Sequence, residues 1–206
     1  MKVKNITLVG YSGHSYLCIE TLIILGINVQ GYYEIEDKLI NPYNLQFFGS
    51  EEHFKLDHNP FISIGDNTIR KKVYHKLSNK KVSLDFNILH PSAIISNTAI
   101  IGEQTFVSSS VIINPQVLIS EGCIINTGAI IEHECRVGAF THIGPSAVLT
   151  GNVSVGDGCM IGANSVIKQG VKVGNNVTIG AGAVIINDVS DNLTIVGNPG
   201  KIIKKI

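Results

Sequence analysis

The sequence has no tryptophan and no net charge, and only 16% of its 206 residues are charged. A chain with balanced charge has no general electrostatic field for nucleic acid, so we expect no nucleic-acid partner. No apolar run approaches the length of about 18 residues that a membrane-spanning helix needs, so we expect no membrane insertion. The first ten residues, MKVKNITLVG, contain no apolar segment typical of a signal peptide, which predicts a cytoplasmic protein.

What the sequence does contain is a repeat of six residues. From Leu89 to Ile185 every sixth residue is Leu, Ile or Val, without an interruption. The residue four positions after each of these is small or β-branched, as in Ala93, Thr105 and Cys123. Short strands with large side chains pointing inward, three to a coil of about 18 residues, satisfy this pattern. The repeat therefore predicts a parallel β-helix that buries its own interior.

The position directly after each inward aliphatic residue is often Gly or Asn. These residues are Gly102, Asn114, Asn126, Gly138, Gly144, Gly156, Gly162, Gly174 and Gly180. We expect them to adopt the positive φ angles of tight corners. The four cysteines show no CxxC or disulfide-framework spacing, and Cys123, Cys135 and Cys159 fall in the small inward row. We expect these three to pack as small apolar side chains.

The first part of the chain has no such repeat. Strand and helix patterns alternate there, with strands expected at 4–9, 27–33 and 61–64 and helices at 15–25 and 68–77. This alternation is typical of a parallel sheet with covering helices. We therefore predict a small Rossmann-like α/β domain over residues 1–82, followed by a β-helix with a C-terminal tail over residues 83–206.

Two histidines of the repeat lie outside the inward rows. Glu132 and Glu134 flank His133, and a neighbouring carboxylate can orient an imidazole and make it a better general base. We expect His142 to lie at a corner after Thr141. A solvated polar turn at His133 and a purely structural β-helix are the alternatives, and the spacing of the two histidines argues against a metal site.

A second candidate site is the turn Gly10-Tyr11-Ser12-Gly13-His14-Ser15, which follows a predicted strand and precedes a predicted helix. Backbone N–H groups at such a helix start favour a phosphate group. The turn does not match GxGxxG, so a dinucleotide cofactor is not expected. A plain turn between a strand and a helix is the alternative.

Four short motifs together carry a family resemblance. They are Gly-Tyr-Ser-Gly-His at 10–14, Ile-Gly-Asp-Asn at 64–67, Asn-Thr-Gly-Ala-Ile-Ile-Glu-His-Glu-Cys at 126–135 and His-Ile-Gly-Pro at 142–145. The chain resembles the sialic-acid O-acetyltransferase type of hexapeptide acetyltransferases. Within this type it is most similar to bacterial N-acetyltransferases of nucleotide-linked 4-amino sugars of the bacillosamine and perosamine pathways. The resemblance implies a left-handed β-helix, a homotrimer, and acetyl-CoA as donor.

The same resemblance implies roles for individual residues. His133 is expected to be the general base, with Glu134 as its partner, in an active site between neighbouring subunits. His142 is expected near the acetyl donor. The expected acceptor-binding residues of the N-terminal domain are Gly10, Ser12, Gly13, His14, Glu34, Gly65 and Asp66.

The donor is expected to lie along the coils. The corner residues expected to bind its pantetheine arm are Gly144, Gly162, Ala163, Gly180 and Ala181. Lys201 is the cation expected for the CoA phosphates, and Lys168 and Lys172 are further cations near the coils, although each lysine is alternatively only solvated. Because a tetrahedral oxyanion needs an N–H donor, the backbone of Gly151, one coil beyond His133, is a candidate for that role.

We therefore expect N-acetylation of a nucleotide-linked 4-amino-deoxy sugar, with UDP favoured and GDP-perosamine second, in bacterial surface glycan synthesis. Because no loop interrupts the hexads, the wall of the acceptor site must come from the N-terminal domain, which favours a large acceptor. O-acetylation of sialic acid or a related sugar is the alternative reaction. A β-helical binding or assembly module is the non-enzymatic alternative.

Overall fold

The structure, a computed structural model, describes residues 5–205, so the predicted first strand begins at Lys4 outside the described residues. A four-stranded parallel sheet forms the N-terminal domain, in the order β3-β2-β1-β4. Its strands are β1 (Asn5–Val9), β2 (Asn28–Tyr33), β3 (Gln46–Phe47) and β4 (Pro60–Ile62), and its helices are α1 (Gly13–Ile24), the short 3-10 turn Glu51–His53, and α2 (Asn67–Asn79). The strand β3 and the 3-10 turn were not predicted, because residues 34–59 carry no alternating apolar pattern.

Seventeen two-residue strands follow, each starting six residues after the one before it. They are β5 (Ile88–Leu89), β6 (Ile94–Ile95), β7 (Ile100–Ile101), β8 (Phe106–Val107), β9 (Ile112–Ile113), β10 (Leu118–Ile119), β11 (Ile124–Ile125), β12 (Ile130–Ile131), β13 (Arg136–Val137), β14 (His142–Ile143), β15 (Val148–Leu149), β16 (Ser154–Val155), β17 (Met160–Ile161), β18 (Val166–Ile167), β19 (Lys172–Val173), β20 (Thr178–Ile179) and β21 (Val184–Ile185). The predicted uninterrupted repeat is confirmed.

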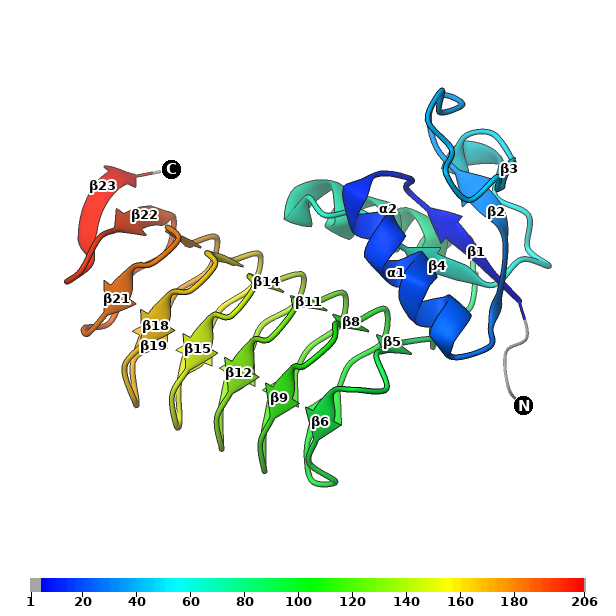
Figure 1. Ribbon diagram of the computed structural model, residues 1–206. Helices are drawn as coiled ribbons and strands as arrows, with labels where there is room; N and C mark the ends of the chain where they lie inside the picture. Colours follow the sequence, from blue (N-terminus) through cyan, green and yellow to red (C-terminus); the bar gives the residue numbers. More distant parts are fainter. Residues whose placement is uncertain (1–4, 206) are drawn as a thin grey trace.

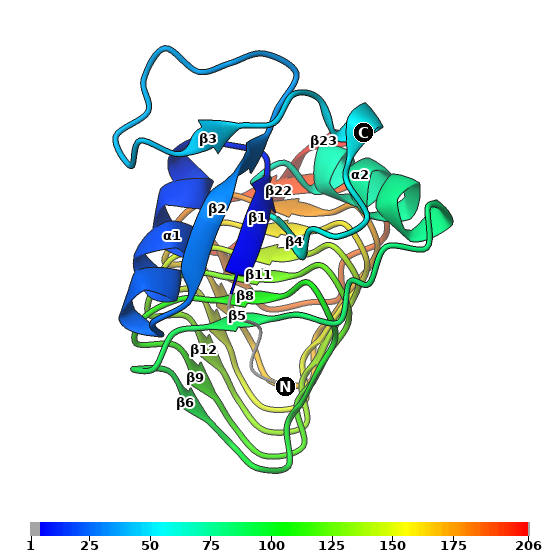
Figure 2. The ribbon, with the colours of Figure 1, turned by 90° about the vertical axis from the view of Figure 1, so that its right-hand side faces the viewer.

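These strands form a triangular solenoid with three parallel sheets (Figure 2). We call the sheet β5-β8-β11-β14-β17-β20 the covered face, because the N-terminal domain lies on it (Figure 1). The sheet β6-β9-β12-β15-β18-β21 is the aliphatic face, and β7-β10-β13-β16-β19 is the polar face. Seen from the N-terminal end in Figure 2, the chain runs counter-clockwise from the covered face to the aliphatic face and the polar face while it moves away from the viewer, so the predicted left-handed coil is confirmed.

Three edges connect the faces, and each contains stacked corners. The cofactor edge joins the covered and aliphatic faces and contains the corners after β14, β17 and β20. The histidine edge joins the aliphatic and polar faces and contains the corners after β12 and β15. The clamp edge joins the polar and covered faces and contains the corners after β10, β13 and β16.

The solenoid interior is filled as the repeat predicts. The inward aliphatic row and the small row form one buried core from Val107 to Ile195, and the four cysteines of the chain are buried and unpaired. The expectation about positive φ angles was wrong. They fall three positions after the inward aliphatic residue, at Gln104, Ser110, Gln116, Gly122, Gly128, Glu134, Phe140, Ser146, Asn152, Gly158, Asn164, Gly170, Asn176 and Gly182.

Glycine at the position after the aliphatic residue has a different cause. A Cβ on Gly144 would lie 2.6 Å from the Ile161 carbonyl oxygen, and one on Gly162 would lie 2.5 Å from the Ala181 nitrogen. Real Cβ atoms do not approach so closely, so the neighbouring coil leaves no room for a side chain. These glycines permit the stacking of coils rather than a left-handed turn.

The solenoid ends in an antiparallel hairpin of β22 (Leu193–Val196) and β23 (Lys201–Lys205). β22 pairs in parallel with β20, so the hairpin extends the covered face. At the other end of that face, the outward side chains of Ile88, Phe106 and Ile124 are buried in the core of the N-terminal domain. The two regions therefore share an apolar interface rather than a flexible tether.

Candidate active site

His133 lies at the corner after β12, on the histidine edge. Its side chain is 52% exposed, and its Nδ1 atom lies 3.1 Å from Oε2 of Glu134. Glu134 occupies the left-handed corner position, with a φ of 62°, and this conformation directs its carboxylate to the neighbouring ring. A carboxylate on Nδ1 keeps the proton on that nitrogen and leaves Nε2 as the acceptor that a general base needs.

The imidazole of His133 lies on Gly151, the equivalent corner residue of the next coil. A Cβ on Gly151 would lie 2.7 Å from both Cε1 and Nε2 of His133, so only glycine fits beneath the ring. No hydrogen bond among the described residues takes up the Gly151 N–H. A free backbone donor beside Nε2 of this imidazole has the placement that stabilisation of an oxyanion requires.

The residues expected to bind the donor lie together on the cofactor edge. The N–H groups of Gly144, Gly162 and Gly180 already donate to the carbonyls of Ile161, Ile179 and Ile195 in the next coil. The N–H groups of Ala163 and Ala181 have no partner among residues 5–205. These two alanines therefore offer the free donors, while the three glycines provide close packing.

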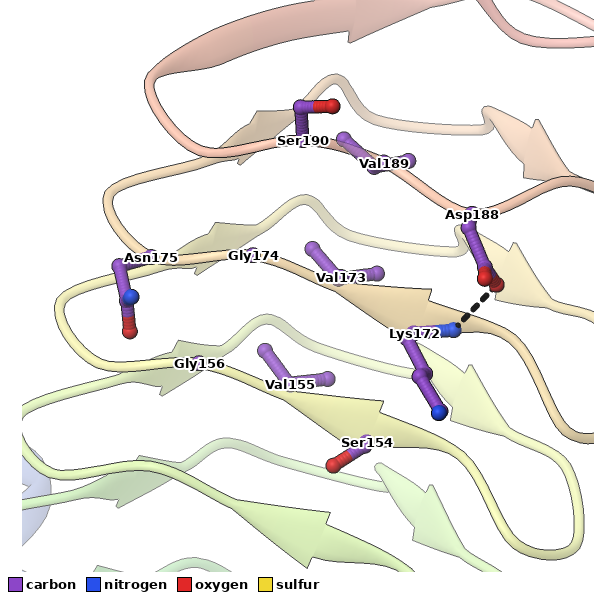
Figure 3. Close-up of a pocket in the computed structure, with 10 residues that line it drawn as sticks. All are labelled: Ser154, Val155, Gly156, Lys172, Val173, Gly174, Asn175, Asp188, Val189 and Ser190. Carbon is purple, nitrogen blue, oxygen red and sulfur yellow. Dashed lines mark hydrogen bonds between the residues drawn. The ribbon is translucent and has the colours of Figure 1, made fainter.

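The three lysines lie at different places. Lys201 begins β23, and the Gly200 N–H beside it donates to the Val184 carbonyl, so Lys201 continues the cofactor edge beyond β20. Lys168 lies on the histidine edge at the corner after β18. Lys172 lies on the polar face and lines a depression of about 410 Å³. There its backbone N–H donates a hydrogen bond to Oδ1 of Asp188 over 2.8 Å (Figure 3). That depression is on neither of the two edges that carry the predicted site.

The corner position expected for His142 was wrong, because His142 begins strand β14 of the covered face. The residue before each inward aliphatic residue always points outward from a strand, and His142 occupies this position before Ile143. Its Nε2 accepts a hydrogen bond from Nδ2 of Asn126 over 3.1 Å, and its Nδ1 is buried without a partner among the described residues. The ring is therefore held under the N-terminal domain.

His14 lies opposite His142, with the two ring centres 6.5 Å apart. The His14 ring packs edge-on against Phe106 of the covered face. Burial, the neighbouring His142 and the charge of Arg70 lower the pKa of His14 to about 3. Burial and Arg70 lower the pKa of His142 to about 4, while the nearby Gly65 carbonyl acts in the opposite direction. Both imidazoles are therefore neutral at neutral pH.

The N-terminal domain has its own cavity, of about 440 Å³, at the carboxyl ends of β1 and β2. Its lining residues are Tyr11, Ser12, Tyr16, Glu36, Asp37, Lys38, Leu39 and Ile40. This is the edge at which parallel α/β sheets bind ligands. Of the predicted acceptor residues only Ser12 lines it, and Gly13 lies beside Ser12 as the first residue of α1.

The family resemblance places Glu34 among the acceptor-binding residues, but its carboxylate accepts hydrogen bonds from the N–H groups of Tyr11 and Ile35. Glu36 and Asp37 are the carboxylates that line the cavity, and sequence reasoning missed them. The signal that could have found them was present, because they follow β2 by only three and four residues. Residues after a strand end lie at the ligand-binding edge of a parallel sheet.

Gly10, Gly65 and Asp66 lie in two turns that touch each other. Gly10 has a φ of 96°, and a Cβ there would lie 2.4 Å from the Ile64 side chain. A Cβ on Gly65 would contact Cβ of His14 at 3.7 Å. Asp66 caps α2 by accepting a hydrogen bond from the Ile69 N–H over 2.8 Å. The structure thus brings Gly10, His14 and Gly65 together and shows a structural role for Asp66.

The predicted residues consequently form three groups. His133, Glu134 and Gly151 lie on the histidine edge, and the donor residues lie on the cofactor edge. The acceptor residues lie above the covered face, on the far side of the solenoid from the histidine edge (Figure 2). The aliphatic face separates the histidine edge from the cofactor edge within one copy of the chain.

Known proteins share this architecture. Residues 5–77 match the PglD N-terminal domain, and residues 152–187 match the bacterial transferase hexapeptide family (six repeats). PerB from Caulobacter crescentus, solved in complex with CoA and GDP-perosamine, is 33% identical, with 97% of each chain covered and a TM-score of 0.90. The acetyltransferase domain of PglB from Neisseria gonorrhoeae FA1090, solved with acetyl coenzyme A, is 28% identical over 97% of this chain and 99% of that chain, with a TM-score of 0.90.

A hexapeptide β-helix with an α/β domain on one face is the architecture of these acetyltransferases. The chain belongs to the hexapeptide-repeat sugar acetyltransferases with a PglD-type N-terminal domain. WeeI from Acinetobacter baumannii AYE has the same fold at 22% identity, over 97% of this chain and 100% of that chain, with a TM-score of 0.83.

Residues 5–205 contain neither a candidate membrane-spanning helix nor a candidate metal site. None of their helices is both long enough and apolar enough to span a membrane. No group of three or more His, Cys, Asp or Glu side chains in this part of the chain is arranged to hold a metal ion.

Proposed function

We propose that the chain transfers an acetyl group from acetyl-CoA to the amino nitrogen of a nucleotide-linked 4-amino-deoxy sugar. The observation that carries the proposal is the exposed His133–Glu134 pair, whose ring lies on Gly151 with its free N–H. The similar proteins PerB and PglB were solved with CoA and acetyl coenzyme A, and PerB also with GDP-perosamine. A UDP-linked sugar is our first candidate acceptor, and GDP-perosamine is the other acceptor to test.

The proposed chemistry uses few groups of the chain. The amine nitrogen attacks the thioester carbonyl carbon and forms the new C–N bond, while Nε2 of His133 takes the amine proton. Glu134 stabilises the resulting imidazolium through Nδ1, as carboxylates do beside catalytic imidazoles. The oxyanion accepts a hydrogen bond from the Gly151 N–H. The C–S bond then breaks, and CoA leaves as a thiol after it takes the proton from His133.

The aliphatic face supports assembly into a homotrimer. Its outward row consists entirely of aliphatic residues: Ile94, Ile112, Ile130, Val148, Val166 and Val184. The outward row of the polar face, in contrast, starts with Ile100 and Leu118 but continues with Arg136, Ser154 and Lys172. A continuous apolar stripe on a sheet is typical of a surface that another chain covers.

Assembly through this face also completes the site. The histidine edge and the cofactor edge border the aliphatic face on opposite sides. Cyclic association through a shared face places one border of each copy against the other border of its neighbour. We therefore infer that His133 of one copy acts as the base for the donor and acceptor that the next copy binds.

The reaction is tested by following CoA release with a thiol reagent. The intact protein is mixed with acetyl-CoA and a panel of UDP-, GDP- and dTDP-linked 4-amino sugars, with free sialic acid as the O-acetylation control. Saturable turnover of an amino sugar, with a mass increase of one acetyl group, is the expected result. Turnover of sialic acid alone would replace the proposal with O-acetylation, and no binding of acetyl-CoA by calorimetry would favour a non-enzymatic module.

The shared site is tested by mixing two inactive variants. His133→Ala removes the base, and Ala181→Trp fills the cofactor edge with a large side chain. If each site takes these elements from different copies, trimers assembled at random from equal amounts of the two variants regain about a quarter of the wild-type activity. If both elements came from one copy, every site in a mixed trimer would carry a defect and activity would stay absent.

A further inference from the structure

Arg70, in the first turn of α2, is the largest fully buried side chain of residues 5–205, with 1% exposure. No carboxylate among these residues forms an ion pair with it. Instead its Nε donates to the Gly122 carbonyl over 2.7 Å, and Nη2 donates to the Phe140 carbonyl over 3.0 Å. A buried guanidinium that reaches carbonyls of another domain is costly unless all of its donors are satisfied.

The carbonyls that Arg70 reaches are equivalent positions of successive coils. Gly122 and Phe140 occupy the left-handed corner position of the clamp edge, one coil apart. Asn67, one turn before Arg70, donates through Nδ2 to Gly158, the same position of the following coil, over 3.3 Å and to Cys159 over 2.9 Å. The first turn of α2 therefore spans three consecutive coils at one edge.

Phe140 adds a packing contact to this edge. Its φ of 57° is unusual for an aromatic residue, and its ring is 1% exposed. A Cβ on Gly122 would lie 2.5 Å from that ring, so glycine is required one coil before it. Tyr74 of α2 packs on the same ring with the centres 5.2 Å apart. These contacts fix where α2 meets the coils.

The rest of the guanidinium holds the turn before α2. Nη1 donates to the carbonyls of Ile64 and Gly65, both over 3.0 Å, and Nη2 donates to Oδ1 of Asn67 over 2.7 Å. The Ile64–Gly65 turn contacts Gly10 and His14, which the family resemblance places in the acceptor site. One side chain thus connects the acceptor turns with the coils of the catalytic solenoid.

Arginine suits this place for a specific reason. Its planar group has five N–H donors, and the structure provides five acceptors around it. A lysine ammonium has three donors on a single nitrogen and cannot reach carbonyls on both sides. The site therefore requires the shape of the guanidinium and not only its charge.

We propose that Arg70 is a positioning residue, which together with Asn67 sets the location of the acceptor turns relative to the β-helix. This inference rests on the proposed function, because it assumes that the N-terminal domain holds the acceptor and the coils hold the donor. A displacement of about 1 Å between reacting groups is enough to lower a rate by about a hundredfold. Arg70 is too deeply buried to touch either substrate itself.

The test compares Arg70→Lys with Tyr74→Phe in the intact protein. Tyr74→Phe is the matched control. Tyr74 lies on the same helix as Arg70, and its hydroxyl contacts Glu103 at the same clamp edge, so the substitution removes one contact between α2 and the coils but leaves the Ile64–Gly65 turn untouched. We expect Arg70→Lys to lower kcat/KM for the nucleotide sugar by about 10- to 100-fold. The KM for acetyl-CoA should stay within about twofold, because the cofactor edge is distant from the clamp edge.

Two further measurements keep the test decisive. Asn67→Ala, which leaves the Ile64 and Gly65 contacts of Arg70 in place, should fold and show a smaller loss than Arg70→Lys. Amide hydrogen exchange should become faster at residues 61–66 in Arg70→Lys and stay unchanged in the coils from 142 to 187. Equal losses in Arg70→Lys and Tyr74→Phe, or equal effects on both substrates, would overturn the positioning role.

The same experiment separates this inference from the proposed function. If the wild-type protein acetylates none of the amino sugars, the proposed function fails, and hydrogen exchange decides the positioning role alone. Faster exchange at 61–66 in Arg70→Lys would then support the role of Arg70 in holding the turn. Unchanged exchange there would refute it.

Discussion

The β-helix and the N-terminal domain are built by different rules. In the β-helix each residue repeats the environment of the residue one coil away, so that Ile125 pairs with Ile143 and Ile143 with Ile161. In the N-terminal domain each side chain has its own environment, such as the stacked pair of Tyr11 and Tyr32. A substitution in the solenoid can therefore be judged against equivalent positions, which the N-terminal domain does not offer.

This difference shows where function can be recognised. In a repeat, a residue that breaks the pattern stands out: His133 lies at a corner position that Gly151 occupies one coil later, and Phe140 lies at a position held by Gly122 and Gly158. A residue that departs from the repeat fits its local backbone conformation less well than the usual residue there, so other contacts must stabilise it. The following predictions test whether departures from the repeat carry function while the repeat itself carries stability.

The largest effect is expected for His133→Ala. Loss of a general base should lower kcat by about 10²- to 10⁴-fold, while thermal stability and assembly stay unchanged because the side chain is exposed. The matched control is Gln169→Ala, at the same corner position two coils later. Steady-state kinetics measure kcat, and sedimentation measures assembly. Equal losses of kcat in the two variants would show that the corner of His133 has no special role in the reaction.

The next effect is a loss of stability at low pH, located where the two regions meet. His14 and His142 have folded-state pKa values of about 3 and about 4, below the ordinary value of 6.5. The unfolded chain therefore takes up protons first as the pH falls below about 6.5, so the stabilisation is present above this pH and is lost progressively down to about pH 4 for His142 and about pH 3 for His14. Each imidazole should lower the free energy of unfolding by about 1.4 kcal/mol for each pH unit in this window.

Urea titrations at pH 7 and pH 5 measure this loss. All six tyrosines of the sequence lie between Tyr11 and Tyr74 and there is no tryptophan, so tyrosine fluorescence reports on the N-terminal domain. His142→Gln should reduce the pH dependence by about half. His133→Gln is the control with an exposed imidazole, and an identical change in both variants would show that burial beneath the domain is not the cause.

A moderate effect is expected for Gly151→Ala. The new methyl group would displace the His133 ring, since it would lie 2.7 Å from Nε2, and kcat should fall by about tenfold. The coil itself should keep its stability, because Ala163 and Ala181 occupy the same corner position elsewhere in the solenoid. Kinetics together with thermal unfolding separate the two effects, and an unchanged kcat would show that the ring is not held by this contact.

The smallest effect is expected for Lys201→Ala at the end of the cofactor edge. Removal of one surface cation should raise the KM for acetyl-CoA by about two- to fivefold at low salt, and the difference should shrink at high salt. Lys204→Ala, on the same strand, is the control expected to keep the wild-type KM. A salt-independent difference would indicate a cause other than attraction of the CoA phosphates.

Sequence reasoning predicted most of the solenoid because its contacts repeat locally. The strands, their inward rows and the exposed corner of His133 all follow from a period of six. His142 was wrongly placed at a corner, because the position within the six-residue repeat was misassigned. The residue before Ile143 is the first residue of a strand and points outward. Positive φ angles were placed two positions too early. Glycine serves both left-handed corners and close packing between coils, and only the contacts with the neighbouring coil show which of the two applies at a given position.

The N-terminal domain was predicted less completely for a physical reason. Strand β3 contains two residues, and its pairing with β2 depends on a loop without any periodic pattern. The contacts of Arg70 with Gly122 and Phe140 join backbone carbonyls over long sequence separations. Any residue has a carbonyl, so no side-chain pattern in the sequence marks such an acceptor.

The constant length of the corners has a consequence for how this molecule can change. An insertion of six residues would keep the interior packed but would move every later side chain to the next face of the prism. Only an insertion of about 18 residues, one full coil, would restore the aliphatic stripe, the histidine edge and the clamp edge to their places. The length of the solenoid is thus restricted by its outer surfaces, whereas its core would accept any whole number of strands.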